Sequence, residues 1–138
     1  METQFRRMGY ALMVVTAAAV FCPAVSFAGD PGCSQEEAFT PFDTSDGDNP
    51  VTTQTGRVVE LRASNRSHCA WGRISSGTPG EEIWTDRREP SSQSHEGFLG
   101  YTRIDSGSAK YTEAFKNDGR VMRACGSSRG VIECTGWF

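Results

Sequence analysis

The sequence predicts an all-β domain, a small antiparallel sandwich or barrel of about seven strands that is stapled by disulfides. Three observations support this fold class. Short segments rich in strand-forming residues recur from Arg57 to Trp137, clusters of Gly, Pro, Ser and Asn separate them, and the apolar residues have no helical periodicity. With 138 residues, the chain has the length of a single domain.

The first element, residues 1–28, has the pattern of a secretory signal peptide. Two arginines precede an apolar run over residues 10–21, and small residues occupy the third and first positions before a cut after Ala28. The apolar run is shorter than the roughly 20 residues that span a membrane, and Pro23 follows it. We therefore expect a secreted protein that begins at Gly29 and has no stable membrane insertion.

The second element, residues 29–56, is acidic. It carries six Asp and Glu residues and no Lys or Arg, with prolines and few apolar side chains. This composition predicts a flexible leader. A solubilising linker is one interpretation, and an arm that lies along a partner or over the rest of the chain is another.

Residues 57–138 are expected to form the β domain. In the first segment Val59, Leu61 and Ala63 alternate with more polar neighbours, a period of two that indicates a strand with one wet face. The expected strands are Arg57–Ser64, Cys69–Ser75, Glu82–Arg87, Phe98–Ile104, Lys110–Lys116, Arg120–Cys125 and Val131–Trp137. The Asp118-Gly119 pair predicts a tight hairpin between the fifth and sixth strands.

Four cysteines remain once the signal peptide is removed. They are Cys33, Cys69, Cys125 and Cys134. An even number in an exported domain indicates two disulfides, for which three pairings are possible. The short, turn-rich separation makes a Cys125–Cys134 bridge the simplest choice, and Cys33 would then pair with Cys69.

A metal site is the weaker alternative for these cysteines. No two of them have the short gap of a zinc site, and His68 and His95 lie at no ligand spacing from each other. We therefore expect neither a metal nor another cofactor.

Five short motifs occur in a characteristic order. They are Val59–Ser64, Cys69–Ile74, Tyr111-Thr112, Arg123–Gly126 and Cys134–Phe138. This order is similar to a family of small exported actinobacterial proteins known only as domain of unknown function 2690, over about Cys33 to Phe138. The resemblance implies a secreted, disulfide-bonded β domain with a Cys-x-Trp pattern, and it implies no activity.

No catalytic residues are predicted. A nucleophilic mechanism needs a base such as His, but His68 adjoins a cysteine expected to be bridged, and His95 lies in a polar loop beside Glu96. The alternative is a small secreted cell-envelope hydrolase that uses carboxylates. Its candidates are Glu81, Glu82, Asp86 and Glu89. Neighbouring arginines mean that an exposed, mixed-charge strand edge explains these residues equally well.

The remaining prediction is a non-enzymatic protein-binding module. Trp, Tyr and Arg dominate the energetics of protein interfaces. The candidate binding residues are Trp84, Arg87, Arg88, Phe98, Tyr101 and Trp137. We expect an extracellular or envelope protein partner, with the chain acting as an adaptor subunit of a toxin-type assembly or as an inhibitor of an extracellular enzyme. A net charge of −3 and the absence of a Lys-rich run do not favour nucleic acid.

Overall fold

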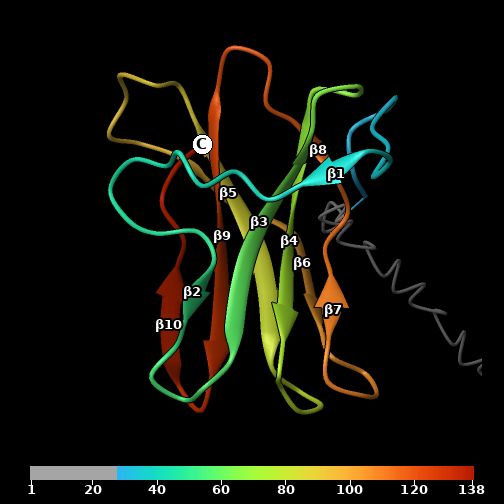
Figure 1. Ribbon diagram of the computed structural model, residues 1–138, viewed down its shortest axis with the longest axis vertical. Helices are drawn as coiled ribbons and strands as arrows, with labels where there is room; N and C mark the ends of the chain where they lie inside the picture. The colour runs from blue at the N-terminus through green and yellow to red at the C-terminus, as the bar shows by residue number, and fades with distance from the viewer. Residues whose placement is uncertain (1–27) are drawn as a thin grey trace, which may run out of the picture.

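Two antiparallel β-sheets, of six and four strands, pack against each other in the computed structural model of the chain (Figure 1). The structure describes residues 28–138, so residues 1–27 of the predicted signal peptide lie outside the described part. Within the described part every element is a strand, which confirms the predicted all-β class. No helix capable of crossing a bilayer is found in residues 28–138.

The described residues form ten strands, compared with about seven predicted, because residues 38–39 and 51–52 add two short strands and the strand predicted over Lys110–Lys116 is divided in two. The six-stranded sheet contains β1 (Ala38–Phe39), β2 (Val51–Thr52), β3 (Val58–Ser64), β4 (Cys69–Ser75), β7 (Lys110–Tyr111) and β8 (Phe115–Lys116). The four-stranded sheet has the order β10 (Val131–Cys134), β9 (Val121–Ser128), β5 (Glu82–Arg88) and β6 (Glu96–Arg103).

The core lies between the two sheets and follows the alternation seen in the sequence. From β3, Val59 and Leu61 point inward, and from the other sheet Ile83 and Met122 meet them, all with no exposed surface. Packing is tight enough that a Cβ added to Gly126 would lie 2.6 Å from Val59 Cγ2. The residues that alternate with these core residues along each strand therefore form the two outer faces of the sandwich.

Residues 29–56, expected to be a flexible leader outside the β domain, instead contribute two strands to the six-stranded sheet. β1 pairs Phe39 with Ala63, and β2 pairs Val51 with Val59. The acidic residues from Glu36 to Asp48 are exposed, so the charges that suggested a separate leader lie on the solvent side of a segment that is built into the sheet.

The strand predicted over Lys110–Lys116 is divided into β7 and β8 at Thr112. The Thr112 amide donates to the Gly72 carbonyl and its hydroxyl accepts from the Gly72 amide, both at 2.9 Å. The Thr112 hydroxyl therefore takes the place of a backbone carbonyl opposite Gly72. Both the amide and the carbonyl of Gly72 keep a hydrogen-bond partner where the strand is interrupted.

The predicted hairpin at Asp118-Gly119 is wrong, although the turn itself is present. The Arg120 amide donates to the Asn117 carbonyl at 3.0 Å, and Gly119 has a φ of 64°. The strands on either side, β8 and β9, belong to different sheets. The turn therefore carries the chain across the sandwich, because local turn chemistry does not decide which strands pair.

Both predicted disulfides are present. Cys33 is bonded to Cys69 and Cys125 to Cys134. The first ties the segment before β1 to the start of β4 and packs beside Trp71. The second joins directly paired residues of β9 and β10.

Candidate functional site

The outer face of the four-stranded sheet collects most of the predicted binding residues. Trp84, Asp86 and Arg88 alternate along β5 with residues that point into the core, so all three lie on the outer face. On β9, Cys125 lies opposite Trp84, and Arg123 lies opposite Asp86. On this face Trp84 therefore lies next to the charged side chains of Asp86 and Arg88 along β5.

An aromatic cluster, defined as Trp84, Phe98 and Tyr101, lies across β5 and β6. The Trp84 and Phe98 rings stack with centroids 4.9 Å apart, and Tyr101 lies 6.3 Å from each of them. Trp84 is 4% exposed, whereas Phe98 is 56% exposed. Trp84 is thus the buried base of the cluster, and Phe98 is its solvent-exposed part.

Two irregularities in β6 direct Phe98 outward. Between the pairs Thr85–Leu99 and Arg87–Glu96, β5 advances two residues while β6 advances three. The same mismatch recurs between Thr85–Leu99 and Ile83–Thr102. Phe98 lies within the first of these bulges with a φ of 58°, an unfavourable conformation for a bulky residue. Strained residues of this kind concentrate at functional sites.

Asp86 lies beneath this bulge with a side chain that is only 4% exposed. Its carboxylate accepts a hydrogen bond from Arg123 Nε at 2.9 Å and a longer one from the Phe98 amide at 3.4 Å. His95 Nε2 approaches the same carboxylate at 3.5 Å. Asp86 also lies near the sulfurs of Cys125 and Cys134, but these are bonded to each other and are not thiolate ligands for a metal.

Trp137 and Arg88 form a second group on the same face, together with Arg123. The two guanidinium carbons lie 4.4 and 4.6 Å from the centre of the Trp137 ring. Trp137 is 7% exposed and exchanges two backbone hydrogen bonds with Ser45. Trp137 therefore fastens the C-terminal segment to the sheet and to residues before β2, and it offers a partner little surface.

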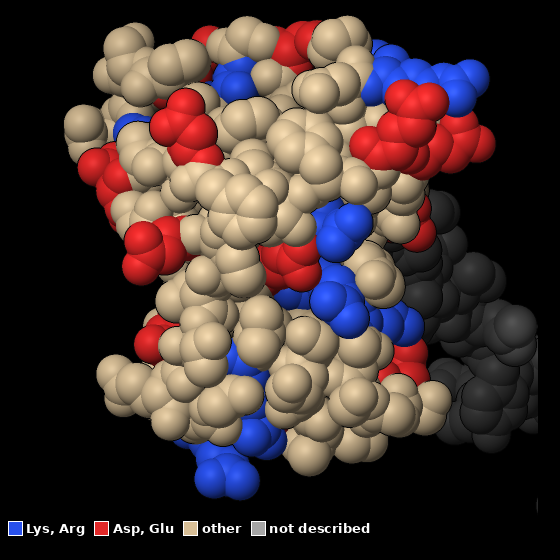
Figure 2. Space-filling view, viewed as in Figure 1, with Lys and Arg blue, Asp and Glu red and all other residues tan. Residues whose placement is uncertain are grey.

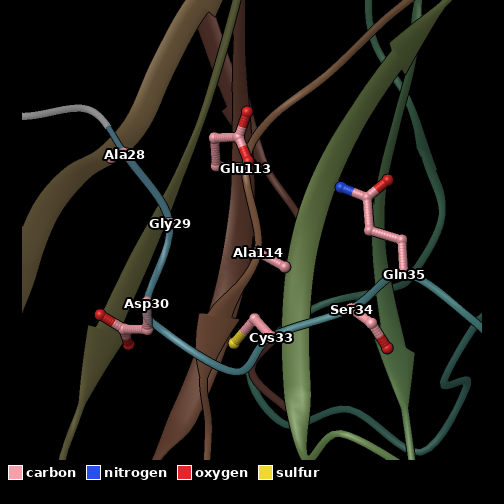
Figure 3. A pocket seen from close by; sticks show the side chains of 8 residues that line it. All are labelled: Ala28, Gly29, Asp30, Cys33, Ser34, Gln35, Glu113 and Ala114. Atoms are coloured by element: carbon pink, nitrogen blue, oxygen red, sulfur yellow. The ribbon is translucent and has the colours of Figure 1, made fainter.

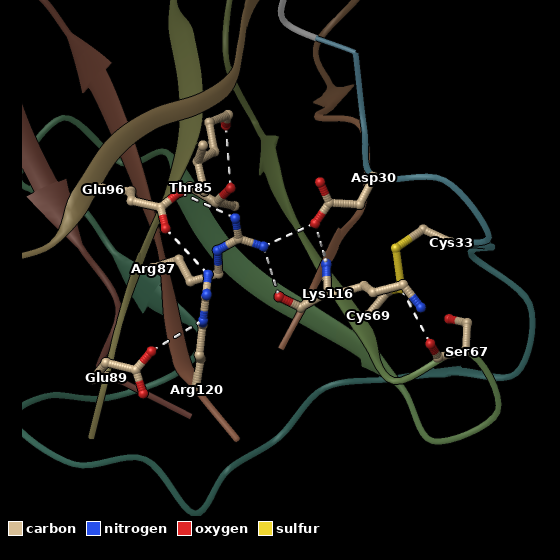
Figure 4. A network of polar contacts seen from close by, with 11 residues as sticks. Asp30, Cys33, Ser67, Cys69, Thr85, Arg87, Glu89, Glu96, Lys116 and Arg120 are labelled. Carbon is tan, nitrogen blue, oxygen red and sulfur yellow. Dashed lines mark hydrogen bonds and ion pairs between the residues drawn. A yellow bond between two sulfur atoms is a disulfide. The ribbon is translucent and has the colours of Figure 1, made fainter. Parts of the chain in front are cut away.

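Arg87 is not part of the outer face, because it alternates with Arg88 and points to the opposite side of β5. Its Nη1 atom contacts the Asp30 carboxylate at 2.8 Å and its Nη2 atom contacts the Glu96 carboxylate at 3.0 Å (Figure 4). Burial acts to raise the pKa of Asp30, but hydrogen bonds from the Lys116 amide and from Arg87 outweigh it and hold that pKa below its usual value. Arg87 is therefore a structural link between β5 and the N-terminal segment.

The carboxylates considered for a hydrolase are each paired with an arginine rather than with each other. Glu81 accepts two hydrogen bonds of 2.8 Å from Arg57 Nε, and this pairing lowers the pKa of Glu81 to about 2. Glu89 lies 3.2 Å from Arg120 Nε. A carboxylate with so low a pKa is ionised at neutral pH and is unsuited to act as a general acid.

A groove of about 600 Å³ lies beside the Cys33–Cys69 disulfide, where Gly29 and Asp30 run alongside Glu113 and Ala114 (Figure 3). The sequence did not indicate it, since its two walls are more than 80 residues apart in the chain. Asp30 is already held by Arg87, so the polar groups here form no convergent catalytic set.

Charges on the opposite face of the molecule are mixed. In the view of Figure 2, Lys and Arg are interspersed with Asp and Glu among wide uncharged areas. On β3 and β4, Glu60 contacts Arg62 at 3.0 Å and Arg73 at 3.4 Å. No broad patch of one sign covers this face.

The candidate residues thus separate into the aromatic cluster, of which Phe98 is exposed, and a structural set formed by Arg87, Arg88 and Trp137. The contribution of Asp86 and Arg123 to the outer face was not predicted, although strand alternation and pairing could have suggested it. Comparisons of the chain with protein-family models, curated proteins and solved structures found no match.

Proposed function

We propose that this protein is a secreted, non-enzymatic protein-binding module whose binding surface is the outer face of the four-stranded sheet. The observation that carries the proposal is the position of Phe98, which is 56% exposed, stacked on a buried Trp84 and held in a strained conformation. Phe98 does not belong to the hydrophobic core between the sheets.

The physical properties of the aromatic cluster suit protein recognition. Binding energy in interfaces is concentrated in a few well-supported aromatic or Arg residues near the centre of the contact. Phe98 loses little rotamer freedom on binding because Trp84 already packs against one side of its ring, at 4.9 Å between centroids. Arg103, whose guanidinium carbon lies 6.0 Å from the Tyr101 ring centre, supplies a polar rim.

Secretion is part of the proposal and rests on the signal-like N-terminal segment and the two disulfides. Outside the cell, the module would act as an adaptor in a toxin-type assembly or as an inhibitor of an extracellular enzyme. The hydrolase alternative is less favoured, because Glu81 and Glu89 are engaged by arginines. Nucleic acid is a less suitable ligand as well, since the chain has a net charge of −3 and no Lys-rich run.

The test compares two exposed phenylalanines. Tagged wild-type protein, Phe98→Ala and Phe42→Ala are secreted by the native host, and co-purifying proteins in the supernatant are quantified by mass spectrometry. Phe42 is 78% exposed and lies outside the aromatic cluster, so its substitution is the matched control. We expect a stoichiometric partner that is retained by Phe42→Ala and weakened at least about tenfold by Phe98→Ala, a loss typical of an interface hot spot.

Two results would reject the proposal. One is a partner that binds Phe98→Ala and wild type equally well. The other is turnover of cell-wall or glycan material that is lost in Glu82→Gln, which would favour the hydrolase alternative instead.

A further inference from the structure

The groove beside the Cys33–Cys69 disulfide contains the point at which the predicted signal peptide is cut. Ala28 and Gly29, the residues on either side of that cut, both line this groove of about 600 Å³, and Glu113 lies on its other wall (Figure 3). Removal of the signal peptide would leave a free α-amino group on Gly29, which is mostly protonated at neutral pH.

The position of Gly29 is fixed by its neighbour Asp30. The Asp30 amide donates to the Ala114 carbonyl at 3.0 Å. Its carboxylate accepts hydrogen bonds from the Lys116 amide at 3.0 Å and from Arg87 Nη1 at 2.8 Å. Because Gly29 is one peptide bond away, its nitrogen is confined to a small part of the groove.

The close approach of the two walls requires glycine at position 29. A Cβ added to Gly29 would lie 2.5 Å from the Ala114 carbonyl oxygen and 3.1 Å from Glu113 Cβ. The Gly29 nitrogen is bonded to the same Cα, so it lies no more than about 6 Å from Glu113 Cβ. The remaining carbons and the carboxylate of a Glu side chain can bridge this separation.

The Glu113 side chain is free to act as a partner. Glu113 is exposed and lies between β7 and β8. Within residues 28–138, its carboxylate takes part in no hydrogen bond or ion pair. Lys110 lines a neighbouring hollow together with Glu113, but its ammonium group is bound to Asp105 at 2.7 Å.

We propose that this groove binds the α-ammonium group of the mature chain, with the Glu113 carboxylate as its counter-ion, an inference that rests on the proposed secretion and cleavage after Ala28. In the uncleaved chain the Gly29 nitrogen is an uncharged amide, so the ion pair forms only after the cut. Chain ends fray unless they are tied down. The pair fastens the new end to the connection between β7 and β8, beside the link that Asp30 makes to Arg87 on β5.

The charged groups around the Gly29 nitrogen determine what the loss of Glu113 does. The Asp30 and Glu113 carboxylates favour the charged form of the amine. Arg87 on β5 and Lys116 on β8 oppose it, and both also act on the Asp30 carboxylate, whose pKa they lower. Without Glu113 the cations outnumber the carboxylates, so a larger fraction of the amine is neutral.

Competitive labelling of the Gly29 amine tests the pair, because only the neutral amine reacts. The exported protein is labelled near neutral pH, its N-terminal peptide is quantified by mass spectrometry, and each rate is divided by the rate in urea. Glu113→Gln should raise this ratio at least about threefold, the effect of one exposed ion pair. Asp43→Asn removes another exposed carboxylate and is the matched control, with the wild-type ratio.

Gly29→Ala is a second variant that leaves Glu113 intact. Its Cβ cannot lie 2.5 Å from the Ala114 oxygen, so the chain end is displaced from the groove. Its amine should label at the ratio of Glu113→Gln, and the double variant should show no further increase.

The outcomes separate this inference from the proposed function. Equal ratios for wild type and Glu113→Gln, in protein whose mass shows Gly29 as the first residue, would overturn the ion pair alone. A different first residue would overturn the ion pair together with the predicted cleavage. Neither result bears on partner binding through Phe98, which the comparison with Phe42→Ala tests.

Discussion

The side chain of Asn49 pairs with the backbone of Leu61 as a neighbouring strand would. Its Nδ2 donates to the Leu61 carbonyl at 2.9 Å, and its Oδ1 accepts from the Leu61 amide at 2.8 Å. A further bond from Nδ2 reaches the Pro41 carbonyl at 2.7 Å. One buried amide thus connects the acidic segment to the middle of β3.

Asn49→Ala should destabilise the protein by about 2 to 4 kcal/mol, because it leaves both polar groups of Leu61 buried without partners. Asn49→Asp should also be destabilising, since an ionised carboxylate cannot donate to the two carbonyls. Urea unfolding measures the change. Asn65→Ala, at an exposed turn position, is the control and should change stability by no more than about 0.5 kcal/mol.

Gly126→Ala should cost about 1 to 3 kcal/mol, the usual penalty for overpacking a core. The added methyl would lie 2.6 Å from Val59 Cγ2. Combining it with Val59→Ala removes that clash, so the double variant should be more stable than the sum of the two single effects predicts. Strictly additive unfolding free energies would contradict this account of the contact.

Acid should weaken the protein through Glu81. Its pKa is lowered to about 2 in the folded state from an ordinary 4.5, so its ionised form favours folding above pH 4.5. That contribution is lost progressively as the pH falls from 4.5 through about 2. Glu81→Gln should lower stability at neutral pH and flatten the pH dependence of the unfolding free energy over this interval. An unchanged pH profile would show that Arg57 does not stabilise the Glu81 carboxylate.

Intact mass analysis of the exported protein should give a chain that begins at Gly29 and lacks four hydrogens relative to its reduced form, as two disulfides require. The chain-entropy account gives about 4 kcal/mol for the 36-residue separation of Cys33 and Cys69 and about 2.5 kcal/mol for the nine-residue separation of Cys125 and Cys134. Replacing each pair by serine should therefore cost more at Cys33–Cys69. Four reactive thiols in native material would reject the crosslinked state.

Phe98→Gly should change stability by no more than about 1 kcal/mol, although it deletes a large aromatic ring. Losing the stacking on Trp84 costs about 0.5 to 1.5 kcal/mol, and relieving the positive φ returns about 1 to 2 kcal/mol. Phe98→Ala keeps the backbone strain and should be the less stable of the two. Phe115→Ala, at a buried ring, is the contrast and should lose about 3 to 5 kcal/mol. A loss of that size in Phe98→Gly would assign Phe98 to the core.

Much of the fold could be predicted because local patterns determine it. Alternation along Val58–Ser64 and Cys69–Ser75 located β3 and β4 to within a residue, since one face of each strand is buried. Cysteine spacing was sufficient to choose the observed disulfides. The short strands β1 and β2 could not be predicted, because two residues carry no period and their pairing with β3 depends on distant residues such as Ala63 and Val59.

The candidate site, too, could be predicted only in part from the sequence. Residue types alone selected Trp84, Phe98 and Tyr101, but not which of these rings is buried, because the bulges in β6 decide that. Arg87 and Arg88 are neighbours in the chain, yet strand alternation sends them to opposite sides of the sheet.

By itself, then, the amino-acid sequence determined the β-rich character of the chain, its crosslinks and the kinds of side chain available for binding, since composition and short periods encode these. Only the tertiary structure decided that the acidic segment belongs to the sheet, that the Asp118-Gly119 turn crosses the sandwich and that Phe98 protrudes. The physical reason is that pairing and exposure depend on contacts between residues far apart in the chain.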